Sequence, residues 1–266
     1  MPLREPRAPA GGAEPSDSSS ARPGSASSAP GAAAIVSVAG AVPPGALGVE
    51  AGGEHLLLLP ERVAFWPRTR TLLVADAHLG KAAAFRCGGI PVPSGTTDVN
   101  LERLTQLVFA CDATRIVFLG DLVHSKAARQ AVGTSFAAWR QRHAGVDIVL
   151  VRGNHDARAG DIDAAWNVRV VSDPLIEDGL ALCHAPRPVA GAFALAGHLH
   201  PSAMLTGRGR DRLRVPCFWF AATQAVLPAF GAFTGTADIA AATGDRVFVV
   251  AGSRVVALEA SSEVER

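Results

Sequence analysis

Histidine and carboxylate residues recur in five short motifs along the middle of the chain. In chain order they are Asp76-Ala77-His78, Gly120-Asp121, Gly153-Asn154-His155-Asp156, a lone His184, and Gly197-His198-Leu199-His200. Carboxylate, amide oxygen and imidazole together suit Mn, Fe or Zn. Taken alone, an Asp-x-His pattern is more often a turn. Separate core or capping histidines are the alternative, and it is strongest for His184. The set as a whole predicts a metal centre.

Each motif follows an apolar stretch with the composition of a buried strand. Strands are expected at Thr71–Ala75, Arg115–Leu119, Asp147–Val151, Leu180–Cys183 and Phe193–Ala196. Because α/β folds place their sites at strand ends, this arrangement favours one shared site.

Two amphipathic helices are expected between the first three of these strands. Thr97 is expected to cap the first helix, whose apolar residues recur at helical spacing at Leu101, Leu104, Val108 and Cys111. The second is expected over Ala127–His143, with one apolar face formed by Val132, Phe136 and Trp139.

Other apolar runs make the second half of the chain mostly β. Further strands are expected at His55–Leu59, Arg62–Trp66, Val168–Val171, Phe218–Ala221 and Arg246–Val250. An alternating β-α-β-α-β segment followed by strands predicts an α/β fold of two packed mixed β-sheets flanked by helices. Residues 35–266 are expected to form this single domain.

Residues 1–34 consist almost entirely of Ala, Gly, Pro and Ser. Such a composition cannot offset the entropy of ordering, so we expect a disordered tail. The basic start at Arg4 and Arg7 would also suit a secretory signal, but no leucine-rich core follows. An overlong assignment of the gene start is the other alternative.

Overall composition excludes several classes of protein. The net charge is +1, from 25 basic and 24 acidic side chains, so no broad field attracts nucleic acid or membrane. The cysteines Cys87, Cys111, Cys183 and Cys217 stand far apart, as free thiols in a reducing compartment would. No apolar run approaches the roughly 18 residues of a membrane span. We expect a cytoplasmic protein.

The order of the five motifs resembles that of calcineurin-like metallophosphoesterases, from about Leu72 to Pro201. The resemblance implies the αββα sandwich of that superfamily and two divalent ions, with Mn²⁺ expected first and Fe or Zn as alternatives. It assigns Asp76, His78 and His200 to one ion, Asn154, His184 and His198 to the other, and Asp121 as the bridge.

The resemblance also implies a mechanism. A hydroxide between the two ions would be the nucleophile, and two ligand carboxylates would leave about two positive charges for a phosphodiester. His155 would stand over the leaving-group oxygen as acid or charge stabiliser, with Asp156 to orient its ring. A solvent-exposed His155 that only stabilises a turn is the alternative.

A narrower resemblance covers about residues 50 to 255. The stretches DAHLGKAAAFR, GIPVPSGTTDVNLERL, GDLVHS, RGNHD, AGHLHP, PCFWF and VLPAFGAFTG are similar to those of the PdeM family, the bacterial ligase-associated DNA damage response endonucleases. That family is grouped with an ATP-dependent DNA ligase, a β-CASP-type exonuclease and a helicase. The resemblance therefore implies DNA as a partner and a nuclease that processes DNA ends.

Local basic residues near the motifs are candidates for substrate binding. They are Lys81 and Arg86 after the first motif, Arg152 before the third, and Arg208 and Arg210 after the last. Contacts with phosphates would give salt-sensitive binding that does not depend on sequence. For Arg152 a structural salt bridge, and for the last pair a solvated hairpin turn, are equally good interpretations.

Two other functions remain open from the residues alone. Hydrolysis of a small phosphodiester such as a cyclic nucleotide would use the same ligand motifs. A non-catalytic docking module is disfavoured, because every ligand position of the pattern is filled.

Overall fold

The computed structural model describes residues 42–207 and 211–258, which belong to one compact unit, Val38–Arg266. The tail predicted for residues 1–34 and the candidates Arg208 and Arg210 lie outside the described residues. Within the described part of the chain, no helix is long and apolar enough to cross a membrane.

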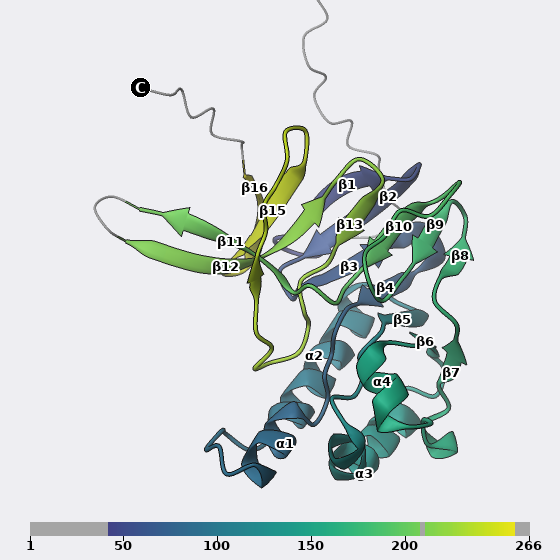
Figure 1. The fold of residues 1–266 in the computed structure, drawn as a ribbon. Coiled ribbons are helices and arrows are strands. Elements are labelled where there is room, and N and C mark those ends of the chain that lie inside the picture. Colours follow the sequence, from purple (N-terminus) through teal and green to yellow (C-terminus); the bar gives the residue numbers. More distant parts are fainter. Residues whose placement is uncertain (1–41, 208–210, 259–266) are drawn as a thin grey trace, which may run out of the picture. The chain divides into compact units, whose positions relative to one another are not determined.

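A first sheet of seven strands forms the middle layer of the fold (Figure 1). Its order follows the chain: β1 (Leu47–Ala51), β2 (Glu54–Leu59), β3 (Val63–Trp66), β4 (Thr71–Val74), β5 (Arg115–Leu119), β6 (Asp147–Val151) and β7 (Arg169–Val171). Strands β1 to β4 pair antiparallel, and β4 to β7 pair parallel. The carboxyl ends of β4, β5 and β6 therefore meet at one edge.

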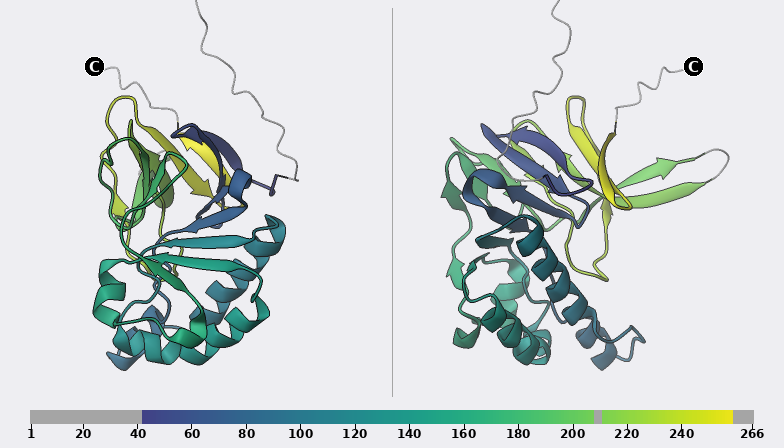
Figure 2. Two further views of the ribbon diagram at one scale, coloured as in Figure 1. Left: turned by 90° about the vertical axis from the view of Figure 1, so that its right-hand side faces the viewer. Right: turned by 180° about the vertical axis from the view of Figure 1, so that it is seen from behind.

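Helices connect the parallel strands β4 to β7, because parallel strands need a crossover connection. The helices are α1 (Lys81–Cys87), α2 (Thr96–Ala110), α3 (Lys126–Arg142) and α4 (Asn154–Ala159), with 3₁₀ turns at Pro67–Thr69 and Ala164–Trp166. Figure 2 shows these helices gathered on one side of the first sheet.

A second sheet packs on the other side. Its main path runs β14 (Ala237–Asp238), β11 (Pro201–Thr206), β12 (Arg212–Phe220), β13 (Gln224–Val226), β10 (Phe193–Ala196), β9 (Leu180–Leu182) and β8 (Leu175–Glu177). Strands β15 (Arg246–Ala251) and β16 (Arg254–Leu258) branch from β12. The β11–β12 hairpin projects from this sheet (Figures 1 and 2).

Successive side chains of a strand point to opposite faces, so the first sheet carries two cores. Leu72 and Val74 of β4 pack with the helices, together with Phe136 and Trp139 of α3. Leu73, between them, packs with the second sheet in a separate cluster. The predicted sandwich of two mixed sheets with flanking helices is thus confirmed, and the α-helices of the described residues lie along the first sheet.

Strands were predicted more accurately than short helices. The bounds of β5 and β6 agree with prediction, and the apolar faces predicted for α2 and α3 are buried. Helix α2 begins after Gly95 rather than at a Thr97 cap, whereas Ser125 caps α3 by accepting from the Ala128 N–H at 3.1 Å. The sequence analysis did not predict helices α1 and α4, because a helix of one or two turns is too short to show apolar residues at helical spacing.

Arg103 of α2 links this helix to two other segments, the turn between β2 and β3 and the segment after β13. Its guanidinium donates to the carbonyl oxygens of Glu61, at 2.8 Å, and Phe230, at 3.1 Å. It also lies 4.1 Å from the centroid of the Phe230 ring. Burial, with the nearby charge of Arg62, lowers the pKa of Arg103 to about 10.

Replacing Arg103 by Met is expected to destabilise the fold, because the carbonyl groups of half-buried Glu61 and buried Phe230 lose a charged donor. Denaturant unfolding should show a loss of about 2–4 kcal/mol in the free energy of unfolding. Arg142→Met, at an exposed position of α3, is the control and should cost about 0.5 kcal/mol. Equal effects of the two substitutions would contradict this role for Arg103.

Candidate metal centre

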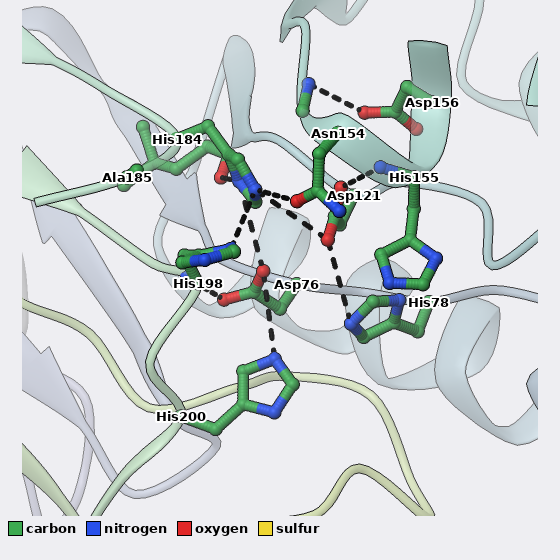
Figure 3. Close-up of polar contacts among 12 residues, drawn as sticks. Asp76, His78, Asp121, Asn154, His155, Asp156, His184, Ala185, His198 and His200 are labelled. Carbon is green, nitrogen blue, oxygen red and sulfur yellow. Dashed lines mark hydrogen bonds and ion pairs between the residues drawn. The ribbon is translucent and has the colours of Figure 1, made fainter. Parts of the chain in front are cut away.

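The five motifs meet at the carboxyl ends of strands from both sheets (Figure 3). Asp76, Asp121 and Asn154 follow β4, β5 and β6 of the first sheet. His184 follows β9, and His198 follows β10, and these strands pair parallel in the second sheet. Parallel neighbours end at the same edge, so two packed sheets bring all five motifs together.

The backbone turns sharply at most of these residues. A positive φ is uncommon outside glycine and costs on the order of 1 kcal/mol per residue. Five candidate ligands have one: Asp76 (49°), His78 (41°), Asp121 (48°), His198 (71°) and His200 (51°). Such strain persists where the surroundings determine the conformation, as at a ligand site.

The first group consists of Asp76, His78 and His200, whose ligand atoms lie within 4.8 Å of one another. Nε2 of His200 is 3.7 Å from Oδ1 of Asp76, while its Nδ1 lies 2.9 Å from the Gly235 carbonyl oxygen. That carbonyl requires the proton on Nδ1, which leaves the Nε2 lone pair directed at the group. Oδ1 of Asp76 is buried and finds no hydrogen-bond partner among the described residues.

The second group consists of Asn154, His184 and His198, with Asp121 beside them. Nδ1 of His184 faces the Leu119 carbonyl oxygen at 3.2 Å, so its Nε2 carries a lone pair. This Nε2 lies 2.7 Å from Oδ1 of Asn154 and 3.0 Å from Nδ1 of His198. Electron-rich atoms that converge in this way suit a cation between them.

Asp121 stands between the two groups. Its Oδ2 is 3.9 Å from Nε2 of His78 in the first group and 3.6 Å from Nε2 of His184 in the second. Its Oδ1 accepts the backbone N–H of His155 at 2.9 Å. Burial raises the pKa of Asp121, so its charged form needs positive charge nearby.

Two glycines make room for the carboxylates. A Cβ on Gly153 would lie 2.3 Å from Oδ1 of Asp121, and a Cβ on Gly197 would lie 2.4 Å from Oδ2 of Asp76. Because each glycine has no side chain, the carboxylate that follows another strand can lie against its backbone. This explains why the third and fifth motifs begin with glycine.

The donor set fits two divalent ions. Burial, followed by the charges of His200 and Lys81, lowers the pKa of His78 to about 2, so this imidazole is neutral and can offer a lone pair. Together the two groups offer four imidazoles, one amide and two carboxylates, a mixture suited to Mn, Fe or Zn. Asp76 is fully buried whereas His198 is exposed, so the centre opens to solvent on the His198 side.

His155 lies beside the two groups, and a backbone carbonyl orients its ring. Nδ1 of His155 is 2.8 Å from the His124 carbonyl oxygen, which leaves Nε2 free to donate or accept a proton. Asp156, expected to hold this ring, instead accepts the backbone N–H groups of Gly153, at 3.0 Å, and Val123, at 3.2 Å. Burial raises its pKa to about 6. Asp156 therefore stabilises the turn that carries Asn154 and His155.

His124 belongs to the site, although the sequence analysis gave it no role. Its ring stacks on His155 with centroids 5.0 Å apart and meets His78 edge-on at 5.5 Å. Burial, then the charge of Lys81, lowers the pKa of His124 to about 4. Its position three residues after Asp121 was the available signal.

The candidate substrate residues are spread more widely. Lys81 begins α1 close to the first group, and its charge acts on His78 and His124. Arg86 is exposed and donates to the Pro93 carbonyl oxygen at 2.8 Å. Arg152 pairs with Asp161 at 3.0 Å, as expected for a structural salt bridge.

Comparisons with known proteins agree with this geometry. The family model of calcineurin-like phosphoesterases matches residues 69–202. The solved structure of the Pseudomonas putida nuclease MPE is 39% identical, with a TM-score of 0.71, over 80% of this chain and all of its own. YfcE, a phosphoesterase from E. coli, is 13% identical over 68% of this chain and 88% of its own. Its TM-score of 0.35 is too low to support an argument. No curated protein matches the chain.

Gly197→Ala is expected to displace the Asp76 carboxylate and weaken metal binding by at least about tenfold, as loss of a supporting contact commonly does. Calorimetric titration with Mn²⁺ would measure the affinity. Gly133→Ala in α3 is the matched control, because its added Cβ meets no atom within 4 Å. Unchanged affinity in Gly197→Ala would show that the close approach has no role.

The variants Asp121→Asn and His155→Ala should distinguish a metal ligand, Asp121, from a residue that binds no metal, His155. Asp121→Asn is expected to lose metal, whereas His155→Ala should retain two ions and lose a factor of about 10²–10⁴ in rate. Metal analysis of the purified proteins, with His55→Ala as a control, would measure this. Loss of both ions in His155→Ala would make His155 a ligand instead.

Proposed function

Because the chain belongs to the calcineurin-like phosphoesterase family, and is therefore a metal-dependent phosphoester hydrolase, we propose that it is a DNA endonuclease of bacterial repair. The observation that carries the proposal is the pair of ligand groups joined by Asp121. Such a pair suits in-line cleavage of a phosphodiester. The 39% identity to a protein named as a nuclease favours nucleic acid as the substrate.

Bound divalent ions, Mn²⁺ in this proposal, supply an activated water and positive charge for the phosphate. The chain's own residues do the rest. Asp121 fixes the spacing of the two groups, and the exposed His198 leaves the phosphate an open approach. His155, with Nδ1 held by the His124 carbonyl oxygen, presents Nε2 to protonate the leaving oxygen.

The repair setting expected from the sequence is part of the proposal. The enzyme would cut DNA in a module with an ATP-dependent DNA ligase, a β-CASP-type exonuclease and a helicase. Its product ends would then be substrates for trimming and joining.

Hydrolysis assays with Mn²⁺ on single-stranded DNA, duplex DNA and bis-p-nitrophenyl phosphate test the proposal. DNA cleavage is expected, and it should vanish in Asp121→Asn and after removal of metal with a chelator. Turnover of the small diester alone would overturn the nuclease proposal and favour a small-molecule phosphodiesterase.

A further inference from the structure

Helix α1 presents a cation and an aromatic ring beside the metal centre. Lys81 and Phe85 are four residues apart, so they share one helix face. Nζ of Lys81 lies 5.7 Å from the centroid of the Phe85 ring. The helix begins three residues after the candidate ligand His78, which keeps this face close to the first ligand group.

A continuous row of rings joins Phe85 to the metal centre. His78 meets His155 edge-on at 5.0 Å, His155 stacks on His124 at 5.0 Å, and the edge of His124 meets Phe85 at 6.3 Å. Phe85 is only half-buried, so part of its ring is open to solvent. The row of rings therefore extends from the metal centre to the part of the Phe85 ring that is open to solvent.

The charge of Lys81 is available for a substrate. The acidic group that acts on it is Asp76, a candidate metal ligand. If Asp76 shared its charge with a bound ion, Lys81 would be a surplus cation at the edge of a positive site. An anion of the substrate would balance it.

We propose that Lys81 and Phe85 form a subsite for the nucleotide next to the scissile bond. Phe85 stacks on the base and Lys81 binds the phosphate of that nucleotide. The subsite lies on the leaving-group side, because its ring row passes through His155. This inference rests on the proposed nuclease function. Stacking on an aromatic ring tolerates any base, so the subsite adds affinity without selecting sequence.

The Phe85 half is tested with two oligomers, a short oligothymidylate and an abasic oligomer of the same length. Wild-type protein with Mn²⁺ should prefer the first in kcat/KM. Phe85→Leu should reduce this preference about tenfold, since stacking contributes roughly 1–3 kcal/mol per base. Phe85→Tyr, which keeps the ring, should retain the preference.

Phe109→Leu is the matched control. Phe109 is exposed and lies 6.1 Å from His143, at the end of α3 remote from the site. The 17 residues of α3 place that end roughly 25 Å from its start. An unchanged preference in Phe85→Leu, with metal content and thermal stability kept, would overturn the stacking role.

The Lys81 half is tested by salt dependence on the same oligothymidylate. Lys81→Met should reduce the slope of log kcat/KM against log salt by about 0.7, the value for one contact with a single strand. Arg142→Met, at the remote end of α3, should leave the slope unchanged. An unchanged slope in Lys81→Met would overturn the phosphate contact. If wild-type protein cut neither oligomer, the nuclease proposal itself would fail, and the subsite with it.

Discussion

The structure depends on two carboxylates that are buried where water cannot stabilise their charge. Asp76 is fully buried and Asp121 is 2% exposed. An isolated buried carboxylate costs far more than a folded protein can supply, so such groups are paired or bind metal. Backbone N–H groups partly compensate, since His198 donates to Asp76 at 2.7 Å and His155 donates to Asp121 at 2.9 Å. The remaining compensation needs positive charge, and the converging imidazole lone pairs show where it belongs.

The layered fold makes this arrangement possible. Two apolar cores, one on each face of the first sheet, hold its parallel strands rigidly between the helices and the second sheet. The strand ends then stay in place although several ligands have costly positive φ angles. The segment after β13 adds to this support, because Phe230 donates its N–H to the Ala75 carbonyl oxygen at 2.8 Å and Gly235 orients His200. Packing energy gained far from the site thus offsets strain within it.

In the proposed function, catalysis and substrate binding occupy different elements. The candidate ligands follow strand ends, where the backbone is held by pairing on both sides. Lys81 and Phe85 come from a seven-residue helix with one buried side chain, Ala82. Such a short helix adapts to changes in sequence more readily than the sheet does. With the proposed subsite on α1, changes in this helix would alter substrate binding while the metal chemistry stays the same.

The sequence by itself predicted the candidate ligands and the strands that precede them. Residue chemistry limits which side chains bind metal, and short apolar runs such as Arg115–Leu119 have few alternatives to a buried strand. Contacts distant in sequence were decided only by the tertiary structure. Asp156 accepts backbone N–H groups rather than holding the His155 ring as expected. His124 lies in the site because it stacks on His155, a residue 31 positions away. These contacts depend on the parallel pairing of β5 with β6, because local sequence favours a strand but does not determine which neighbours its end will meet.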